Sequence, residues 1–265
     1  MTPIVSIITI TMNHLAYIKD MLNSLFTTGK PSIPFEIIIV DNCSLDGTRE
    51  YIESQYPDIK LIKNKKIYGF AENNNIGVSH ATGKYTLILN PDIIVMPHSI
   101  DKLYQFAEAN PACGIIAPKL LNTNGTLQYS ARHFLSPKIL FQRIVTGGDD
   151  KSNIKGTRYY LMKDISMEQP TDVDWCMGAA LLLRRAFYEE LNGFDPKFFL
   201  YVEDMDICHR CWQKGKRVTY YPLSAFVHVH KRDSRTLSKK TWIHLRSFLY
   251  FLRKNKFNVI AHPTP

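Results

Sequence analysis

The chain has 265 residues, of which 45% are hydrophobic and only 13 are glycine, so it is one large globular domain with or without an appendage, and not a disordered chain. No apolar run reaches the roughly 18 residues of a membrane-spanning helix, and the first residues lack the basic region and cleavage site of a signal peptide. The five cysteines are scattered and odd in number, which is typical of reduced thiols, so we expect a cytoplasmic protein.

The net charge of +9 is concentrated at the carboxyl end of the chain. Residues 231–265 hold nine of the 33 Lys and Arg residues but only one of the 24 Asp and Glu residues. The tail therefore carries most of the net charge, and the rest of the chain is nearly neutral. This asymmetry predicts an anionic partner for the tail and not for the whole protein.

Apolar runs alternate with helical patterns along the first half of the chain, and this alternation predicts an α/β fold with a doubly wound, mostly parallel sheet. We expect strands at 4–11, 35–40, 59–62, 85–89 and 113–118. We expect helices at 15–26, 48–55, 70–80 and about 98–109. A hairpin turn at 122–125 with a returning strand at 127–130 should follow.

The second half of the chain is less regular. Residues 134–169 lack a clear pattern and predict either a lid or an ordinary surface loop. The apolar run 173–184 surrounds Gly178, where the backbone can approach a ligand. We expect helices at 185–190 and from about Glu203 to just before Gly215, and two short strands at 218–221 and 225–229.

Polar residues follow the expected strand 85–89 at its carboxyl end, where open α/β sheets bind ligands. Asn90 and Asp92 flank Pro91, which must end the strand because proline cannot donate to a sheet ladder. Two oxygen ligands at such a turn suit a hard divalent cation that also binds phosphates. In the alternative interpretation, Asp92 only caps the segment that follows.

Three asparagines, Asn73, Asn74 and Asn75, lie at the centre of the expected helix 70–80. Asparagine is a poor helix former, because its side chain competes for backbone hydrogen bonds. We therefore expect at least one of these amides to face a functional site.

Three carboxylates, Glu203, Asp204 and Asp206, fall in the first turn of their expected helix, where the helix dipole alone would favour them. An aromatic cluster within residues 198–201 directly precedes them. Apolar surroundings raise the pKa of a carboxyl group, as a general base that works near neutrality requires. The pattern therefore also favours a catalytic site.

Several short motifs occur in one order along the chain. They are TITMN (9–13), VDNCSLDGT (40–48), GFAENN (69–74), NPD (90–92), GFD (193–195), EDMD (203–206) and His228. In this order and spacing the sequence resembles glycosyltransferase family 2, which has the GT-A fold. The resemblance covers residues 4 to about 254 and is closest to the bacterial rhamnosyltransferase-like members that build surface polysaccharides.

The resemblance implies an inverting transfer of a sugar from a nucleotide diphosphate donor to a saccharide acceptor. It favours rhamnose carried on dTDP as the donor and makes a lipid-linked acceptor plausible, with a UDP-sugar as the alternative donor. Asp204 matches the catalytic base of the family, and Glu203 is its partner in the motif. The positions that match nucleotide-binding residues of the family are Thr11, Asn13, Asp41, Asn73, Asn74, Asn90 and Asp92.

The resemblance also implies a divalent metal cofactor, Mg²⁺ or Mn²⁺. Asn90 and Asp92 stand where the family has its Asp-x-Asp metal motif, and His228 matches a histidine that can ligate the metal or the diphosphate. Asn90 departs from the pattern, because a neutral amide replaces a carboxylate, and this weakens the expected metal affinity.

Three other interpretations compete with an enzyme. A catalytically inactive nucleotide-sugar- or glycan-binding domain of the same fold has only Asn90 in its favour. A nucleic-acid-binding tail lacks a reader motif on a nearly neutral body, so we expect no nucleic-acid partner. A zinc site at Cys208 and Cys211 would need His228 and His230 as further ligands, and buried free thiols are favoured instead.

The tail contains Trp242, Leu245, Leu249 and Leu252 at helical spacing, with Phe248 beside this stripe. A basic helix with an apolar face is typical of peptides that lie on an anionic bilayer, here the inner face of the plasma membrane. In the alternative interpretation, the stripe packs on the catalytic domain and the charges are simply solvated.

These patterns divide the chain into three parts. Residues 1–118 form a nucleotide-sugar-binding, Rossmann-like half, and residues 119–230 form the acceptor-binding and catalytic half of the same GT-A domain. Residues 231–265 form a basic amphipathic tail.

Overall fold

The first apolar run of the sequence forms β1 (Val5–Thr11), which is paired on both edges. β1 pairs in parallel with β2 (Phe35–Asp41) and with β4 (Tyr85–Leu89), and β2 pairs in parallel with β3 (Lys60–Lys63). A helix follows each of the first three strands: α1 (Leu15–Phe26), α2 (Thr48–Gln55) and α3 (Phe70–Ser79). The predicted doubly wound arrangement of the first half is confirmed.

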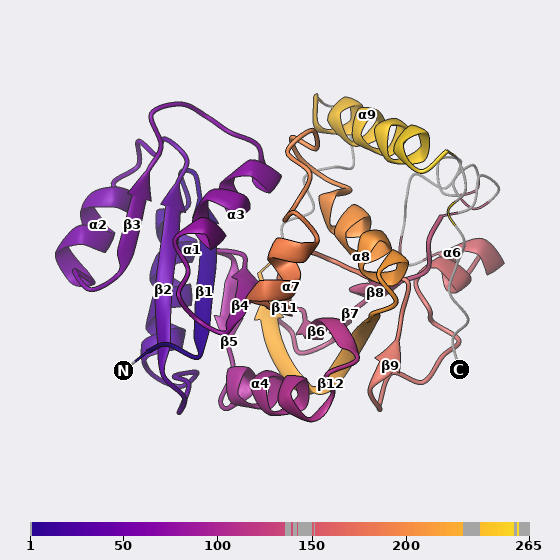
Figure 1. Cartoon of the computed structure of the whole chain (residues 1–265), viewed down its shortest axis with the longest axis horizontal. Coiled ribbons are helices and arrows are strands. Elements are labelled where there is room, and N and C mark those ends of the chain that lie inside the picture. The colour runs from indigo at the N-terminus through magenta and orange to yellow at the C-terminus, as the bar shows by residue number, and fades with distance from the viewer. Residues whose placement is uncertain are drawn as a thin grey trace.

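The structure is a computed structural model that describes residues 2–135, 139, 142, 150, 152–229, 239–256 and 259. In these residues the main sheet has ten strands, eight of them in the order β3-β2-β1-β4-β11-β6-β12-β5 (Figure 1). The strands of the second half are β5 (Ile93–Val95), β6 (Cys113–Leu121), β11 (Ala180–Arg184) and β12 (Arg217–His228). Short strands β7 (Leu127–Gln128) and β9 (Thr171–Asp172) pair with β6 and β12, and β8 (Ala131–Arg132) pairs with β10 (Trp175–Cys176) as a separate ribbon.

The sheet is mixed, because β11 lies antiparallel between β4 and β6. β6 and β12 pair in parallel, so β1, β2, β3, β4, β6 and β12 share one direction. Most strands are therefore parallel in direction, as the GT-A expectation requires. The boundary predicted at residue 118 falls within β6, and the division into two halves stays a prediction.

The remaining helices cover both faces of the sheet (Figure 1). They are α4 (Ser99–Ala109), α6 (Lys155–Tyr160), α7 (Arg185–Glu190), α8 (Glu203–Gln213) and α9 (Lys239–Lys254). α6 lies in the segment that showed no pattern, and much of residues 134–151 lies outside the described residues. Figure 1 shows α9 next to α8, on the opposite side of the molecule from α4.

Two predicted elements were wrong in detail. The strands expected at 218–221 and 225–229 form the single strand β12, with a register shift between Tyr221 and Ala225. Pro222 lies in this shift and has no N–H group, so the ladder is locally irregular but resumes afterwards. The three-residue strand β5 was not expected, because its pairing with the end of β12 is a long-range contact.

The two faces of the sheet bury separate hydrophobic cores, and β1 shows the alternation. Val5 and Ile7 face the core beneath α1 and α4, whereas Ile8 faces the core that includes residues of α3, α8 and α9. A fully buried aliphatic side chain contributes about 1.5–3 kcal/mol to folding. α3 lies directly on β1, because a Cβ atom at Gly77 would come within 2.4 Å of Ile8 Cγ2.

Candidate functional site

The carboxyl ends of β1 and β2 place two buried oxygen-bearing side chains side by side. Thr11 and Asp41 are neighbours in the strand register, and both side chains are inaccessible to solvent. Asp41 Oδ2 accepts hydrogen bonds from the Ser44 backbone N–H, at 3.1 Å, and from Arg49. Thr11 Oγ1 and Asp41 Oδ1 have no hydrogen-bond partner among the described residues. A buried polar atom without a hydrogen bond costs free energy. These two oxygens therefore indicate where a ligand could donate hydrogen bonds.

Asn13 connects the loops that follow β1 and β2. Its backbone N–H donates to Ser44 Oγ at 2.9 Å, and its Oδ1 accepts from the Leu45 N–H at 2.7 Å. Its φ of 57° lies in the left-handed region that asparagine tolerates better than most residues. Asn13 thus shapes the rim of the Thr11–Asp41 site, and its predicted contact with the nucleotide stays a prediction.

Asn73 and Asn74 are both buried in α3. The Asn73 amide donates to the carbonyls of Tyr68 and Gly69, at 3.1 and 2.9 Å, and accepts from Asn64 Nδ2 at 2.6 Å. Asn74 Nδ2 donates to Phe70 O, while Asn74 Oδ1 has no partner among the described residues. Asn73 therefore fixes the loop before α3, and Asn74 keeps one acceptor for a ligand.

Asn75 has a structural position. Its amide donates to Phe194 O at 2.7 Å and accepts from Tyr188 Oη and the Phe194 N–H, at 2.6 and 2.9 Å. These bonds join α3 to the turn after α7. The unusual run of asparagines is thus largely explained by bonds within the protein.

Asp92 and His228 meet at the paired ends of β5 and β12. His228 pairs with Ile93 in the strand register, and its Nε2 lies 3.3 Å from Asp92 Oδ2. The other ring nitrogen, Nδ1, lies 2.6 Å from Gln128 Oε1, which can only accept, so Nδ1 carries a proton. Nε2 then faces the carboxylate either as a second proton donor or as a ligand for a shared cation.

The side chains at this edge suit a divalent cation that substrate phosphates help to bind. Asp92 is partly exposed while His228 is 3% exposed, so a ligand can approach from the carboxylate side. Asn90 belongs to the same turn, where the Ile93 N–H donates to its carbonyl at 3.3 Å. The described residues contain no cluster of three or more His, Cys, Asp or Glu side chains that could hold a metal. A carboxylate, an imidazole and an amide fit Mg²⁺ or Mn²⁺ only if phosphate oxygens complete the coordination.

Cys208 and Cys211 are buried free thiols, as predicted. Burial raises the pKa of both groups, and the Cys211 thiol donates to Lys216 O at 3.5 Å. His230, the fourth member of the alternative zinc set, lies outside the described residues.

The first turn of α8 carries the predicted catalytic carboxylates. Asp204 Oδ2 accepts the Gly178 N–H at 2.9 Å, and Oδ1 accepts the Met205 N–H at 2.8 Å. A Cβ atom at position 178 would lie 3.2 Å from Asp204 Cβ, so glycine permits this close approach. The backbone at Gly178 thus approaches Asp204, and its predicted approach to a ligand stays a prediction.

The segment of Gly178 and Ala179 links the two parts of the site. Ala179 O accepts the Asn90 N–H at 2.9 Å, and the preceding residue donates to Asp204. One short stretch of backbone therefore contacts both the Asn90–Asp92 turn and the carboxylate on α8.

Glu203 and Asp204 are adjacent but lie in different environments. Burial raises the pKa of both carboxyl groups. The pKa of Glu203 rises well above its ordinary value, because the negative charge of Asp204 raises it further. For Asp204 the N–H groups of Gly178 and Met205 and the charge of Arg132 oppose the rise. Glu203 therefore retains a proton more readily, and Asp204 is the carboxylate that ionises first.

The backbone before Glu203 is strained. Tyr201 and Val202 have φ angles of 67° and 72°, and a left-handed conformation is costly for a β-branched valine. α9 supports this segment, because Ser247 Oγ donates to Leu200 O at 2.9 Å and the His244 ring lies 5.2 Å from that of Tyr201. The start of α8 is thus fixed from outside the helix.

Asp206, the third carboxylate of the turn, anchors α9. It is fully buried, its Oδ2 accepts a hydrogen bond from Arg210 Nε at 2.8 Å, and its Oδ1 forms an ion pair with Lys254 Nζ at 2.7 Å. Lys254 also lies 2.8 Å from Asp195 Oδ2. The ion-pair partners of Asp206 are therefore Arg210 and Lys254, two side chains of the protein itself.

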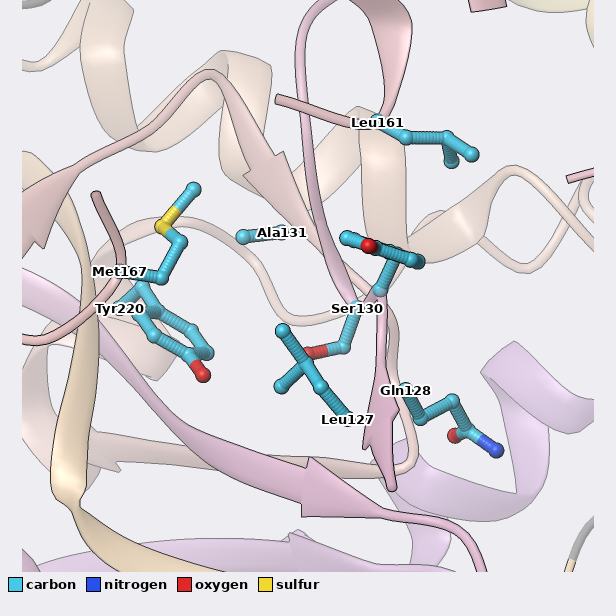
Figure 2. A pocket seen from close by; sticks show the side chains of 8 residues that line it. Leu127, Gln128, Ser130, Ala131, Leu161, Met167 and Tyr220 are labelled. Atoms are coloured by element: carbon cyan, nitrogen blue, oxygen red, sulfur yellow. The ribbon is translucent and has the colours of Figure 1, made fainter. Parts of the chain in front are cut away.

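A small hollow beside Gln128 is lined by residues of the 127–131 segment together with Leu161, Met167 and Tyr220 (Figure 2). Its lining is mainly apolar, with the hydroxyl groups of Ser130 and Tyr220 among the side chains in Figure 2. Gln128, which positions His228, was not predicted as a site residue, because its role depends on the pairing of β7 with β6 and on the long strand β12.

Known proteins share this architecture. The chain resembles GalNAc-T7, solved with UDP, GalNAc and Mn²⁺, with a TM-score of 0.69 and 17% identity over 95% of this chain and 48% of that chain. It also resembles a mannosyltransferase of Pyrobaculum calidifontis, solved with GDP-Man and Mn²⁺, with a TM-score of 0.65 and 18% identity over 99% of this chain and 67% of that chain. These likenesses establish the GT-A fold.

Two curated relatives match most of the sequence. The rhamnosyltransferase WbbL of Escherichia coli is 30% identical, over 94% of this chain and 93% of its own length. The N-acetylglucosaminyl-diphospho-decaprenol L-rhamnosyltransferase of Mycobacterium tuberculosis is 28% identical, over 88% of this chain and 78% of its own length.

Two family models match overlapping parts of the chain. The model of the N-terminal domain of galactosyltransferase matches residues 165–232, which include Asp204 and His228. The model of glycosyl transferase family 2 matches residues 6–191, more than half of the chain and the whole of the Thr11–Asp41 and Asn90–Asp92 region. The chain therefore belongs to glycosyl transferase family 2.

Proposed function

We propose that this glycosyltransferase moves rhamnose from dTDP-rhamnose to a lipid-linked saccharide acceptor, with inversion at the sugar carbon. The observation that carries the proposal is the backbone link through Gly178 and Ala179, which joins Asp204 to the Asn90–Asp92 turn. The names of the two curated relatives support the choice of rhamnose, and the name of the mycobacterial one supports a lipid-linked acceptor.

Asp204 is the general base in this proposal. It accepts the proton of the acceptor hydroxyl group while the acceptor oxygen forms a bond to the sugar carbon and the bond to the nucleotide diphosphate breaks. The backbone N–H groups of Gly178 and Met205 donate hydrogen bonds to Asp204 and so orient its carboxylate. Burial and the charge of Asp204 raise the pKa of Glu203, so Glu203 holds its proton to a higher pH than Asp204 does.

Asp92, His228 and Asn90 are the proposed metal ligands. When bound there, Mg²⁺ or Mn²⁺ would neutralise the charge that develops on the leaving diphosphate. GalNAc-T7 and the Pyrobaculum calidifontis mannosyltransferase were each solved with Mn²⁺ together with a nucleotide or nucleotide sugar, which supports a metal of this kind. Gln128 orients His228 so that its Nε2 faces Asp92.

We propose that Thr11, Asp41 and Asn74 accept hydrogen bonds from the nucleoside. Each has a buried oxygen without a hydrogen-bond partner in the described part of the chain. Thymine and uracil both present a ring N–H donor, so a UDP-sugar is the alternative that a donor screen must separate. Thermal-shift measurements with dTDP-, UDP- and GDP-sugars, each with and without Mn²⁺, make that separation.

The tail helix α9 presents a second, exposed apolar face. Phe248 and Phe251 are buried against the domain, whereas Trp242, Leu245 and Leu249 are 68%, 40% and 42% exposed. Three residues of the predicted stripe are therefore exposed, while the fourth, Leu252, packs against the core. Arg246 and Arg253 are exposed on the same helix. Exposed apolar side chains beside cations are complementary to an anionic lipid surface, which we propose as the partner of α9.

Docking of α9 on a bilayer would bring the proposed base toward a lipid-linked acceptor, because α9 contacts both Leu200 and Asp206 near the start of α8. Among the described residues, no helix combines the length and the apolar character that crossing a membrane requires. The inner face of the plasma membrane as the place of action stays a prediction.

We expect Asp204→Asn to lower the transfer rate by about 10²–10⁴, the usual effect of removing a general base. Donor affinity, measured by calorimetry, should stay near the wild-type value. Glu203→Gln is the matched control, because a neutral amide of the same size replaces a carboxyl group whose pKa is raised by burial, and it should retain most of the rate. Turnover near wild type in Asp204→Asn would exclude Asp204 as the base.

Glu203→Gln should also change how stability depends on pH. The pKa of Glu203 is raised by folding, so the unfolded chain releases this proton near its ordinary value of 4.5 while the folded protein retains it. Wild-type stability therefore falls as pH rises from that value through the raised pKa. The Gln variant lacks this loss, so its melting temperature should gain on wild type as pH increases. Parallel melting curves against pH, like those expected for the exposed control Glu190→Gln, would contradict the assignment.

Asp92→Ala should weaken binding of dTDP-rhamnose and remove its dependence on Mn²⁺, because the carboxylate is the strongest proposed ligand. Asn90→Asp should strengthen the metal response, since it restores a second carboxylate. Titration calorimetry with and without Mn²⁺ measures both effects. Unchanged donor affinity of Asp92→Ala in the presence of Mn²⁺ would refute the metal site.

Sedimentation with vesicles should show binding that rises with anionic lipid content and falls with salt. Replacing Arg246 and Arg253 by Gln should weaken it, while the matched change of the exposed Lys65 and Lys66 should not. Trp242→Ala should also weaken binding, in contrast to a change at the exposed Leu223 of β12. If binding does not change with lipid charge, with salt or with the α9 substitutions, α9 is not the membrane-binding element and is a helix that only packs on the domain.

A further inference from the structure

Arg132, at the end of β8, is a cation that lies against two aromatic rings. Its Cζ atom lies 5.2 Å from the ring centroid of Tyr160 and 5.3 Å from that of Trp175. Its Nη1 donates to Tyr160 Oη at 2.9 Å, and its side chain is 15% exposed. Removing a charged group from water is costly, so a cation at such a place needs nearby negative charge.

Arg132 lies close to the segment that holds Asp204. The Met177 N–H donates to Ser130 O at 3.0 Å, and Arg132 Nη2 lies 3.5 Å from Met177 Sδ. The next residue, Gly178, donates its N–H to Asp204. Arg132 of β8 therefore contacts Met177, and Asp204 of α8 contacts the next residue, Gly178.

Several ionisable groups surround Asp204. They are Glu203 and Cys208 of α8, Cys176 of β10 and Arg132 of β8. Asp206 follows on α8 and is occupied by Arg210 and Lys254. Of the groups that act on Asp204, the thiols and Glu203 can add only negative charge, whereas Arg132 supplies positive charge. Its charge lowers the pKa of Asp204 against the effect of burial.

We propose that Arg132 is a positioning residue whose charge keeps Asp204 ionised, and therefore able to accept the proton of the acceptor hydroxyl group. This inference rests on the proposed role of Asp204 as the base. The rings of Tyr160 and Trp175 hold the guanidinium in place, and the partly buried setting strengthens its effect, because solvent screens the two charges less there than at an open surface. Asp150, 4.0 Å from Nη2, is the other carboxylate near this cation.

The pH dependence of kcat/KM for rhamnosyl transfer distinguishes this role from simple packing. In Arg132→Gln the acidic limb of the kcat/KM profile should move to higher pH. The loss of kcat/KM on the acidic side should therefore be about tenfold or more larger than the loss on the plateau at higher pH. Arg132→Lys keeps the charge and should keep the limb near its wild-type position. Tyr160→Phe removes one hydrogen bond to Arg132 but neither the ring nor the charge, and serves as the matched control. A uniform loss of rate at all pH values in Arg132→Gln would overturn the proposal.

A titration without substrate separates this proposal from the proposed reaction. The carboxyl ¹³C signal of Asp204, assigned through Asp204→Asn, should titrate at higher pH in Arg132→Gln than in wild type or in Arg132→Lys. If Arg132→Gln fails to fold, Arg132→Met fills the same space against the rings without charge. Unchanged titration would refute the charge coupling even in an active enzyme, whereas a shifted titration in a protein that transfers no sugar would refute only the reaction.

Discussion

The parallel pairing of β1 with β2 and β4 determines where the proposed donor-site residues lie. Their carboxyl ends share one edge of the sheet, so Thr11, Asp41 and the Asn90–Asp92 turn are assembled from parts of the chain far apart in sequence. The buried oxygens of Thr11 and Asp41 that lack partners among the described residues each cost about 1–3 kcal/mol. Two hydrophobic cores, one on each face of the sheet, offset that cost.

The antiparallel strand β11 brings the second half of the site to this edge. It lies against β4, so its first residues come beside the turn that ends β4. Ala179 then contacts Asn90, and Gly178 contacts Asp204. A side chain at position 178 would crowd Asp204, so the absence of a Cβ atom there allows the proposed base to lie close to the backbone that also contacts Asn90. The reversal of one strand thus has a direct chemical consequence.

Local patterns predicted most strands and helices, because apolar periodicity and Pro and Gly signals act over a few residues. The same patterns missed β5 and the antiparallel insertion of β11, which depend on pairing between distant segments. Asp92 and His228 were each predicted as ligands, and the structure places them 3.3 Å apart. Gln128 and Arg132 were missed, since a short hairpin strand gives no signal that its side chains reach the proposed site. At least one asparagine of α3 was expected to face a functional site, and this stays a prediction, since most of the partners that the structure gives these amides are backbone groups.

The tail helix shows a related limit of amphipathic patterns. One stripe of apolar residues was read as a single face, yet α9 divides its apolar residues between the buried Phe248 and Phe251 and the exposed Trp242, Leu245 and Leu249. The ion pairs of Lys254 with Asp195 and Asp206 fix the rotation of the helix that produces this division. Because the same helix contacts the strained segment before Glu203, the orientation of its exposed face and the placement of Glu203 and Asp204 depend on one set of contacts.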